Sequence, residues 1–156
     1  MKIHLIVVGT RMPAWVETAY ADYAGRMPRE CRLQLVEIPV AERGKNADIA
    51  RLKQAEGEKI LKAIPRDSMV IALDERGETL GSTEWSREMA QWLQSGRDTC
   101  LLVGGPDGHA AEVLQRADRR WSLSKLTLPH GMVRVMLAEQ LYRAWTLLGN
   151  HPYHRA

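Results

Sequence analysis

A glycine-rich segment beginning at residue 104 has the composition of a ligand-binding turn. A short apolar run ends at Val103, and Gly104-Gly105-Pro106-Asp107-Gly108 follows it directly. In a parallel α/β sheet such a turn lies at the carboxyl edge, where ligands bind, and glycine lets a ligand approach the backbone closely. The spacing matches neither the dinucleotide signature G-x-G-x-x-G nor the triphosphate signature G-x-x-x-x-G-K-[ST]. An ordinary turn is the alternative explanation.

Residues 121–131 form a second candidate binding segment, in which serines and a threonine alternate with leucines. An apolar pocket with a few fixed polar groups is what an adenosine-like ligand requires. An alternating edge strand fits the same pattern, so both interpretations stay open.

The C-terminal hexapeptide, Asn150-His151-Pro152-Tyr153-His154-Arg155, gathers two imidazoles, an aromatic ring and a guanidinium. Such groups stack on a nucleic-acid base and contact phosphate. The alternatives are a terminus without function and a His-x-x-His metal pair. Because no third ligand is near in sequence, we expect no metal.

Two cations, Arg43 and Lys45, precede a predicted helix that Asn46 is expected to cap. Free backbone N–H groups at a helix start, together with these cations, would form a phosphate clamp. A solvated loop is the alternative. The chain contains neither a G-x-S-x-G elbow nor paired carboxylates with a convincing acid–base spacing, so hydrolase chemistry has no support.

The elements that must position these residues follow from the hydropathy pattern. Apolar runs at residues 3–8, 33–38, 69–73 and 100–103 predict buried strands. Segments with helical spacing separate them, one running to about residue 63 and another in which Ser82 is expected to cap the first turn. The alternation predicts an α/β fold with a mainly parallel sheet flanked by helices.

The last predicted helix, residues 132–148, is apolar on two faces. The faces consist of Val133, Met136, Leu137, Leu141, Ala144, Trp145 and Leu148, and of Val135, Ala138 and Tyr142. One sheet cannot cover both faces, so the second is expected to pack either on a partner subunit or on further elements of the same chain.

The length and composition predict one globular domain, residues 1–156. With 156 residues and 45% hydrophobic content, the chain can bury one sizeable core but not two. Its longest early apolar stretch is too short to span a membrane, and no secretory signal follows, so we expect a cytoplasmic protein. Cys31 and Cys100 are isolated, which favours neither a disulfide nor a zinc site.

The net charge of +3 is unevenly distributed along the chain. Residues 1–114 hold 15 Lys and Arg against 17 Asp and Glu, whereas residues 115–156 hold 7 against 2. The C-terminal quarter is therefore where a polyanion is expected to bind, with a basic solvated surface as the alternative.

Several of these segments together resemble a known family. They are Val8-Gly9-Thr10, Arg43-Gly44-Lys45-Asn46-Ala47-Asp48, Gly104-Gly105-Pro106-Asp107-Gly108, Trp121-Ser122-Leu123-Ser124, Leu126-Thr127-Leu128-Pro129-His130 and the C-terminal hexapeptide. Their order and spacing, over the whole chain, are similar to those of the large-subunit ribosomal RNA methyltransferase H family in the SPOUT superfamily.

The resemblance implies a SPOUT fold, in which the C-terminal part threads through a loop to form a deep trefoil knot. It also implies a homodimer, S-adenosylmethionine as methyl donor, and the N3 atom of a pseudouridine in 23S ribosomal RNA as acceptor. We expect this RNA to be presented on an assembled large subunit or whole ribosome. The expected cofactor positions are Leu73, Gly104, Gly105, Leu123, Ser124, Lys125, Leu126, Thr127 and Leu128. RNA contacts are expected from Arg43, Lys45, His151, Tyr153, His154 and Arg155.

Methyl transfer to an imide nitrogen requires that the nitrogen lose its proton. The candidates are His154 as proton acceptor and Arg155 or Arg143 as the nearby positive charge. Glu139 is either a further candidate base or an ordinary solvated glutamate. Two other functions are compatible with the same motifs: a non-catalytic ribosome-binding factor, and a SPOUT methyltransferase acting on transfer RNA.

Overall fold

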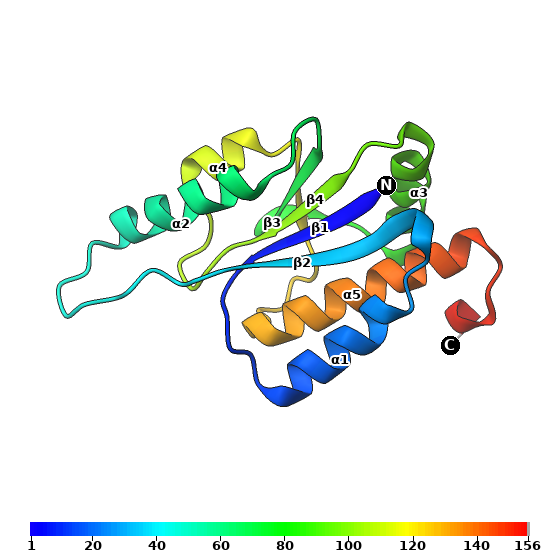
Figure 1. The fold of residues 1–156 in the computed structure, drawn as a ribbon, viewed down its shortest axis with the longest axis horizontal. Helices are drawn as coiled ribbons and strands as arrows, with labels where there is room; N and C mark the ends of the chain where they lie inside the picture. Colours follow the sequence, from blue (N-terminus) through cyan, green and yellow to red (C-terminus); the bar gives the residue numbers. More distant parts are fainter. Residues whose placement is uncertain (156) are drawn as a thin grey trace.

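The computed structural model describes residues 1–155, with Arg155 described by its backbone alone. Five strands form one sheet: β1 (Lys2–Val8), β2 (Arg32–Ile38), β3 (Met69–Thr79), β4 (Thr99–Val103) and β5 (Arg119–Ser122). Their order is β2-β1-β4-β3-β5, and each neighbouring pair is parallel (Figure 1). The predicted parallel sheet is confirmed, while the trefoil knot stays a prediction.

Helices cover both faces of this sheet. They are α1 (Ala14–Gly25), α2 (Ile49–Ala63), α3 (Ser82–Ser95), α4 (Ala111–Arg116) and α5 (His130–Leu148), with short 3-10 turns at Arg29–Cys31 and Pro152–Arg155. The core on one face contains Ile60 of α2 and Val113 of α4. The core on the other face contains Tyr20 of α1, Met89 of α3 and Leu137 of α5.

The predicted cap of α2 is wrong. The helix begins at Ile49, and Asp48 rather than Asn46 is its N-cap. The Asp48 carboxylate accepts hydrogen bonds from the backbone N–H groups of Ala50 at 3.1 Å and Arg51 at 3.4 Å. A charged acceptor makes the stronger bonds to these donors, which explains its position at the helix start.

The predicted cap of α3 is also wrong. The N-cap is Gly81, whose N–H donates to the Glu84 carboxylate at 3.1 Å. The Ser82 hydroxyl instead donates to Gln140 Oε1 at 2.6 Å and so links α3 to α5. The hydroxyl therefore bonds a side chain on another helix and not a backbone N–H group in the first turn of its own helix.

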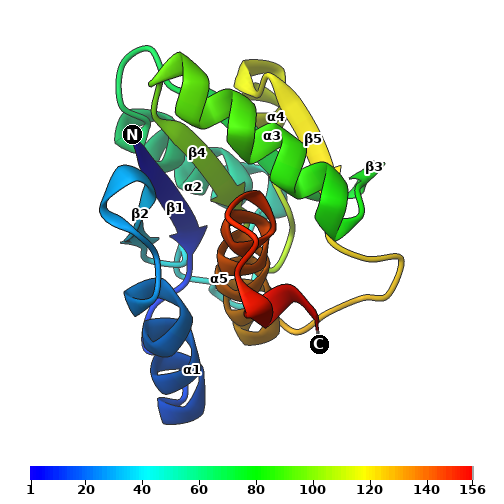
Figure 2. The ribbon, with the colours of Figure 1, turned by 90° about the vertical axis from the view of Figure 1, so that its right-hand side faces the viewer.

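Helix α5 lies between α1 and α3, as Figure 2 shows nearly along its axis. Ala138 and Tyr142, on its second apolar face, are buried in the same core as Leu137. Elements of the same chain therefore cover these two residues, whereas Val135 on the same face is only partly buried. Helix α1, which provides part of that cover, was missing from the prediction because its apolar residues do not form a clear stripe.

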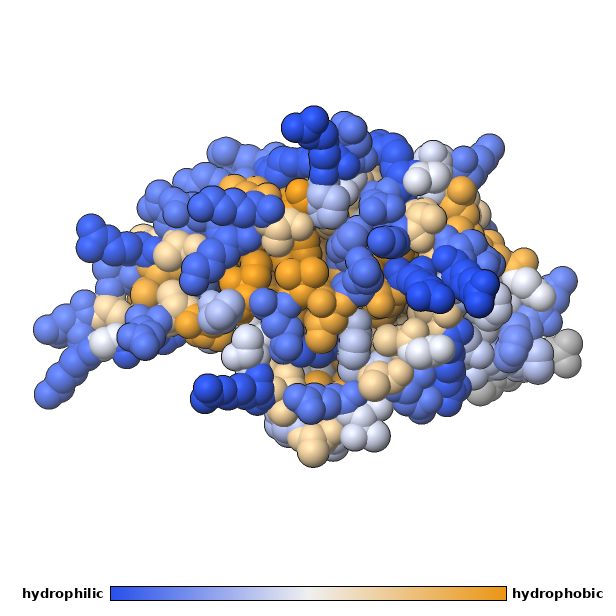
Figure 3. Space-filling model, in the orientation of Figure 1, coloured by the Kyte–Doolittle hydropathy of each residue, from blue (hydrophilic) through white to orange (hydrophobic). Residues whose placement is uncertain are grey.

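Apolar surface gathers along the β2 edge of the sheet, within a rim of hydrophilic side chains (Figure 3). Leu33, Leu35 and Val36 of this edge strand are partly exposed. None of the helices in the described part of the chain combines the length and the apolar character that crossing a bilayer requires.

The pairing of β3 with β5 is interrupted. Leu73 and Glu78 both lie opposite Trp121, so the residues between them bulge out of the ladder. Gly77 is required there, since a Cβ atom at this position would lie 2.7 Å from the carbonyl carbon of Arg120. The break begins directly after Leu73, where the apolar run ends, and it leaves Asp74 at the carboxyl edge.

Candidate functional site

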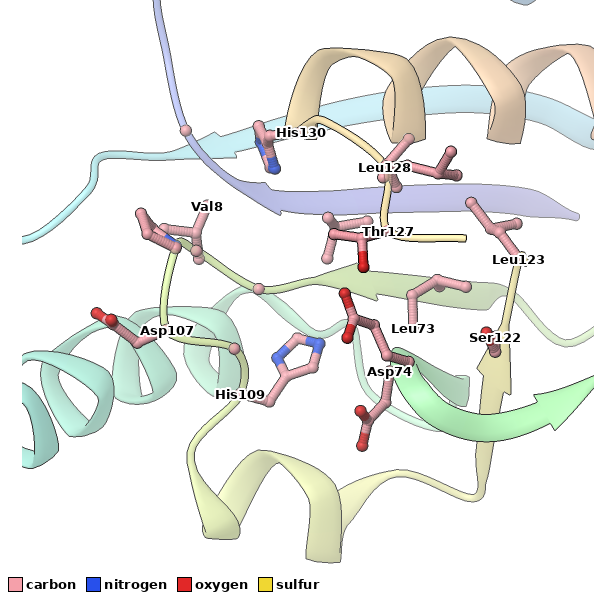
Figure 4. Close-up of a pocket in the computed structure, with 18 of the residues that line it drawn as sticks. Val8, Leu73, Asp74, Asp107, His109, Ser122, Leu123, Thr127, Leu128 and His130 are labelled. Atoms are coloured by element: carbon pink, nitrogen blue, oxygen red, sulfur yellow. The ribbon is translucent and has the colours of Figure 1, made fainter. Parts of the chain in front are cut away.

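A cavity of about 840 Å³ opens at the carboxyl edge of the sheet, where β1 and β4 end and the pairing of β3 is interrupted. Figure 4 shows side chains from these strand ends and from the segment before α5 converging on it. The volume falls in the range that accommodates a cofactor-sized ligand. Of the expected cofactor positions, those that line it are Leu73, Gly104, Gly105, Leu123, Ser124, Leu126, Thr127 and Leu128.

The first two glycines of the turn have no room for a side chain. A Cβ atom on Gly104 would lie 2.9 Å from the carbonyl carbon of Gly108, and one on Gly105 would lie 2.9 Å from Glu56 Oε1. Gly108 adopts a φ of +81°, and its N–H donates to the Gly105 carbonyl at 3.0 Å. The turn is therefore a tight wall that exposes backbone to the cavity.

The segment after β5 is held by two serines. The Ser122 hydroxyl donates to the Ser124 carbonyl, and the Ser124 hydroxyl accepts from the Leu126 N–H, each at 2.9 Å. The structure thus combines both sequence interpretations, an edge strand to Ser122 followed by a cavity-lining loop. Lys125 is exposed and is not among the lining residues, so its contact with the cofactor stays a prediction. The serine bonds hold the loop so that its apolar neighbours line the cavity.

Two polar residues that sequence analysis missed also line the cavity. Asp74 stands at the break in β3, and His109 closes the glycine turn (Figure 4). The Nε2 atom of His109 lies 3.1 Å from the Leu102 carbonyl oxygen, and burial lowers the pKa of this imidazole. Asp74 is the first polar residue after the apolar run that forms its strand, which is a signal that could have found it.

His130, at the first turn of α5, forms the wall opposite the glycine turn. Burial lowers the pKa of His130, and the positive charge of Arg134 lowers it further. Its Nε2 atom faces Gly9, where a Cβ atom would lie only 2.8 Å away. The Val8-Gly9-Thr10 motif therefore lies at the cavity.

Arg43 reaches the glycine turn, where its guanidinium forms an ion pair with Asp107. Lys45 is exposed. The predicted phosphate clamp loses part of its basis, because the Asp48 carboxylate already occupies the first N–H groups of α2. What remains is one arginine beside the cavity and one lysine on the same loop.

The C-terminal hexapeptide docks at the other end of α5 (Figure 1). This helix of 19 residues is about 28 Å long at its usual rise per residue. The Tyr153 ring packs edge-on against Tyr142, with centroids 4.8 Å apart, and its hydroxyl donates to Glu139 Oε1 at 2.8 Å. Tyr153 is thus an anchor of the tail, so the expectation that it stacks on a base has no support here.

Neither His154 nor Arg143 is among the residues that line the cavity of their own chain. His154 lies in the docked tail, and the Arg143 guanidinium is bound to Glu139 at 2.7 Å. Glu139 also accepts from Tyr153 and from Gln140, so its carboxylate is neither a free base nor simply solvated. The side chain of Arg155 lies outside the described residues.

The model of the predicted SPOUT methyltransferase family matches residues 1–154. The chain belongs to this family. Its relatives include proteins named ribosomal RNA large subunit methyltransferase H from Thioalkalivibrio sulfidiphilus and Hydrogenovibrio crunogenus. They are 59% and 54% identical to this SPOUT methyltransferase, and each alignment covers 99% of both chains.

Solved structures share the fold at low sequence identity. A methylase-family protein from Haemophilus influenzae aligns with a TM-score of 0.59 at 15% identity, over 95% of this chain and 66% of that one. One from Neisseria gonorrhoeae aligns with a TM-score of 0.52 at 13% identity, over 90% of this chain and 81% of that one. These two likenesses support the sheet and helix arrangement alone.

Proposed function

We propose that this SPOUT methyltransferase transfers a methyl group from S-adenosylmethionine to the N3 atom of a pseudouridine in large-subunit ribosomal RNA. The observation that carries the proposal is the cavity between the glycine turn and the loop after β5, in a chain with full-length relatives named for this RNA. A cytoplasmic protein acting on an assembled ribosomal particle fits that substrate.

The cavity suits S-adenosylmethionine in size and chemistry. Its walls combine glycine backbone with apolar side chains such as Leu73 and Leu128, as an adenine ring requires. Asp74, Asp107 and Arg76 add charged groups for the polar end of the ligand. When bound, this cofactor supplies an electrophilic methyl group on a sulfonium.

The remaining chemistry falls to the chain's own residues. The N3 atom of the base is protonated at neutral pH, and a proton acceptor must remove this proton before the nitrogen can attack. His154 is the proposed acceptor, since its imidazole belongs to the tail and its buried Nδ1 atom has no hydrogen-bond partner among the described residues. The positive charges of Arg143 and Arg155 would stabilise the anion, although Arg143 shares its charge with Glu139.

A homodimer would bring the cavity of one subunit together with the C-terminal tail of the other. Within one chain α5 separates the tail from the cavity, so the tail of a second subunit must complete the site. The partly exposed apolar residues of the β2 edge, together with the exposed Trp15 and Met132, offer surface that association would bury. A two-fold pair is the commonest arrangement and would build two equal sites.

At a cofactor concentration that saturates the wild-type cavity but not the Gly104→Val cavity, a mixture of two impaired variants is expected to regain activity. Gly104→Val damages the cavity and His154→Ala damages the tail, but a mixed dimer contains one site with both parts sound. Random pairing would restore about a quarter of the wild-type rate. The measurement is methyl transfer after co-refolding the two variants, with each variant alone as control. A monomeric mass in solution, or no recovery in the mixture, would refute a shared site.

Methyl incorporation is expected only into particles that carry the pseudouridine. The test compares tritiated methyl transfer to ribosomal particles prepared with the pseudouridine and with uridine at the same position. Free RNA should be a poorer substrate, because 7 Lys and Arg in the last 42 residues allow few phosphate contacts. Equal incorporation into both particles, or full activity on transfer RNA, would contradict the assignment of this pseudouridine as the substrate. No transfer at all, despite tight ribosome binding, would favour a non-catalytic factor.

A further inference from the structure

Arg134, on the second turn of α5, is a guanidinium buried behind the wall of the cavity. Its side chain is only 3% exposed. Its Nη1 donates to Glu37 Oε2 at 2.9 Å, and its Nη2 donates to the Gly9 carbonyl at 3.3 Å. Removing a guanidinium from water is costly even when it is paired, so apolar packing alone does not account for an arginine here.

Both partners of Arg134 lie where strands reach the carboxyl edge. Glu37 is the next-to-last residue of β2, and Gly9 follows the end of β1. The Gly9 N–H extends the ladder by donating to the Ile38 carbonyl at 2.7 Å, and the chain then turns with a φ of +145°. Because the chain turns here, the Gly9 carbonyl does not continue the strand pairing. It accepts a hydrogen bond from Arg134 instead.

The turn that Arg134 holds is part of the cavity wall. Gly9 and His130 both line the cavity and touch so closely that a Cβ atom on Gly9 would collide with the imidazole. Arg134 lies one helical turn after His130. Arg134 therefore links the start of α5, which carries His130, to the turn at Gly9. These are the two segments that form this wall.

The side chain of Arg134 also borders a smaller cavity of about 270 Å³, together with Tyr20, Glu17 and Leu35. This space lies between α1, β2 and α5, away from the ligand. It gives a substituted side chain room to relax, so changes at residue 134 should move the wall without unfolding the protein.

We propose that Arg134 is a positioning residue of the methyltransferase site. By bonding Glu37 and the Gly9 carbonyl, it fixes the wall that Gly9 and His130 form and thereby the position of the cofactor. The proposal rests on the proposed function for its ligand, but it concerns binding, which is measured separately from methyl transfer.

The test compares two substitutions. Arg134→Met keeps the length of the side chain and removes both hydrogen bonds. It is expected to raise the Kd and the KM for S-adenosylmethionine roughly tenfold, the effect of losing one charge-assisted hydrogen bond, and to lower kcat less. Arg134→Lys keeps the positive charge near Glu37 but lacks the planar guanidinium that reaches both partners. It should therefore bind S-adenosylmethionine more tightly than Arg134→Met and less tightly than the wild type.

Two further variants make the result decisive. Arg87→Met, at an exposed position of α3, is the matched control and should change neither constant. Glu37→Gln should weaken binding in the same direction as Arg134→Met but less. If Arg134→Met lowers Tm while Kd and KM stay at wild-type values, Arg134 is only a structural residue and the proposal is overturned. If the wild type binds the cofactor but modifies no ribosomal RNA, the proposed function fails and the Kd comparison still decides the role of Arg134.

Discussion

A valine at position 104 is expected to weaken S-adenosylmethionine binding about tenfold to about a hundredfold, the equivalent of an overpacking cost of about 1–3 kcal/mol. The Cβ atom alone would lie 2.9 Å from the Gly108 carbonyl carbon and 3.2 Å from the His109 nitrogen. Both neighbours are backbone of the same tight turn and cannot rotate away. The turn must open, or the branched side chain must enter the cavity, and either change removes ligand contacts.

Calorimetric titration of the purified variant measures this effect. Gly25→Val is the matched control, because a Cβ atom there meets nothing within 4 Å and Gly25 lies at the end of α1. The control should bind as the wild type does, and both variants should keep the wild-type far-UV circular dichroism. Unchanged affinity in Gly104→Val would place the cofactor elsewhere.

Substitution of His154 by alanine is expected to lower the rate of methyl transfer by about 10²- to 10⁴-fold, the usual contribution of a general base. Cofactor affinity should stay at the wild-type value, because the tail lies at the other end of α5 from the chain's own cavity. The substitution leaves Tyr153 in place, so the contacts with Glu139 and Tyr142 still anchor the tail.

Single-turnover methyl transfer and cofactor titration on the same preparation separate these two effects. Tyr153→Ala serves as the comparison, since it removes the anchor and should lower both the rate and the melting temperature. A His154→Ala enzyme with wild-type turnover would exclude this imidazole as the proton acceptor. The mixing experiment would then need a variant whose tail is deleted from His151 onward.

Much of the site was predictable because it depends on local sequence. Buried strands appear as unbroken apolar runs, and in a parallel sheet their ends meet at one edge. The glycine turn after β4 could therefore be assigned to the ligand edge from its pattern, whereas the serine-leucine segment after β5 was joined to the same pocket only through the family resemblance. Whether Lys125 joins them is harder to predict, because contiguity in sequence does not fix which way a loop side chain points.

The parts that sequence analysis missed depend on contacts between distant residues. Arg134 and Glu37 are 97 residues apart, and nothing in either neighbourhood marks them as a pair. Ser82 was expected to cap its own helix but donates to Gln140, 58 residues away. The cover of α5 by α1 and α3 is likewise a property of the assembled layers, and the hydropathy pattern of α5 alone fits a partner subunit equally well.

The order of strands in the sheet has a consequence for how the protein is made. The central strand β1 pairs with β4 through residues as far apart as Ile3 and Thr99, and the cavity draws its walls from Val8 through to Val133. During synthesis the first strand can pair early with β2, but its other partner, β4, emerges much later. A nascent chain that has not yet released the segment from Ser122 to Val133 has no complete pocket. The enzyme can acquire its methyl donor only once the segment through Val133 has been made.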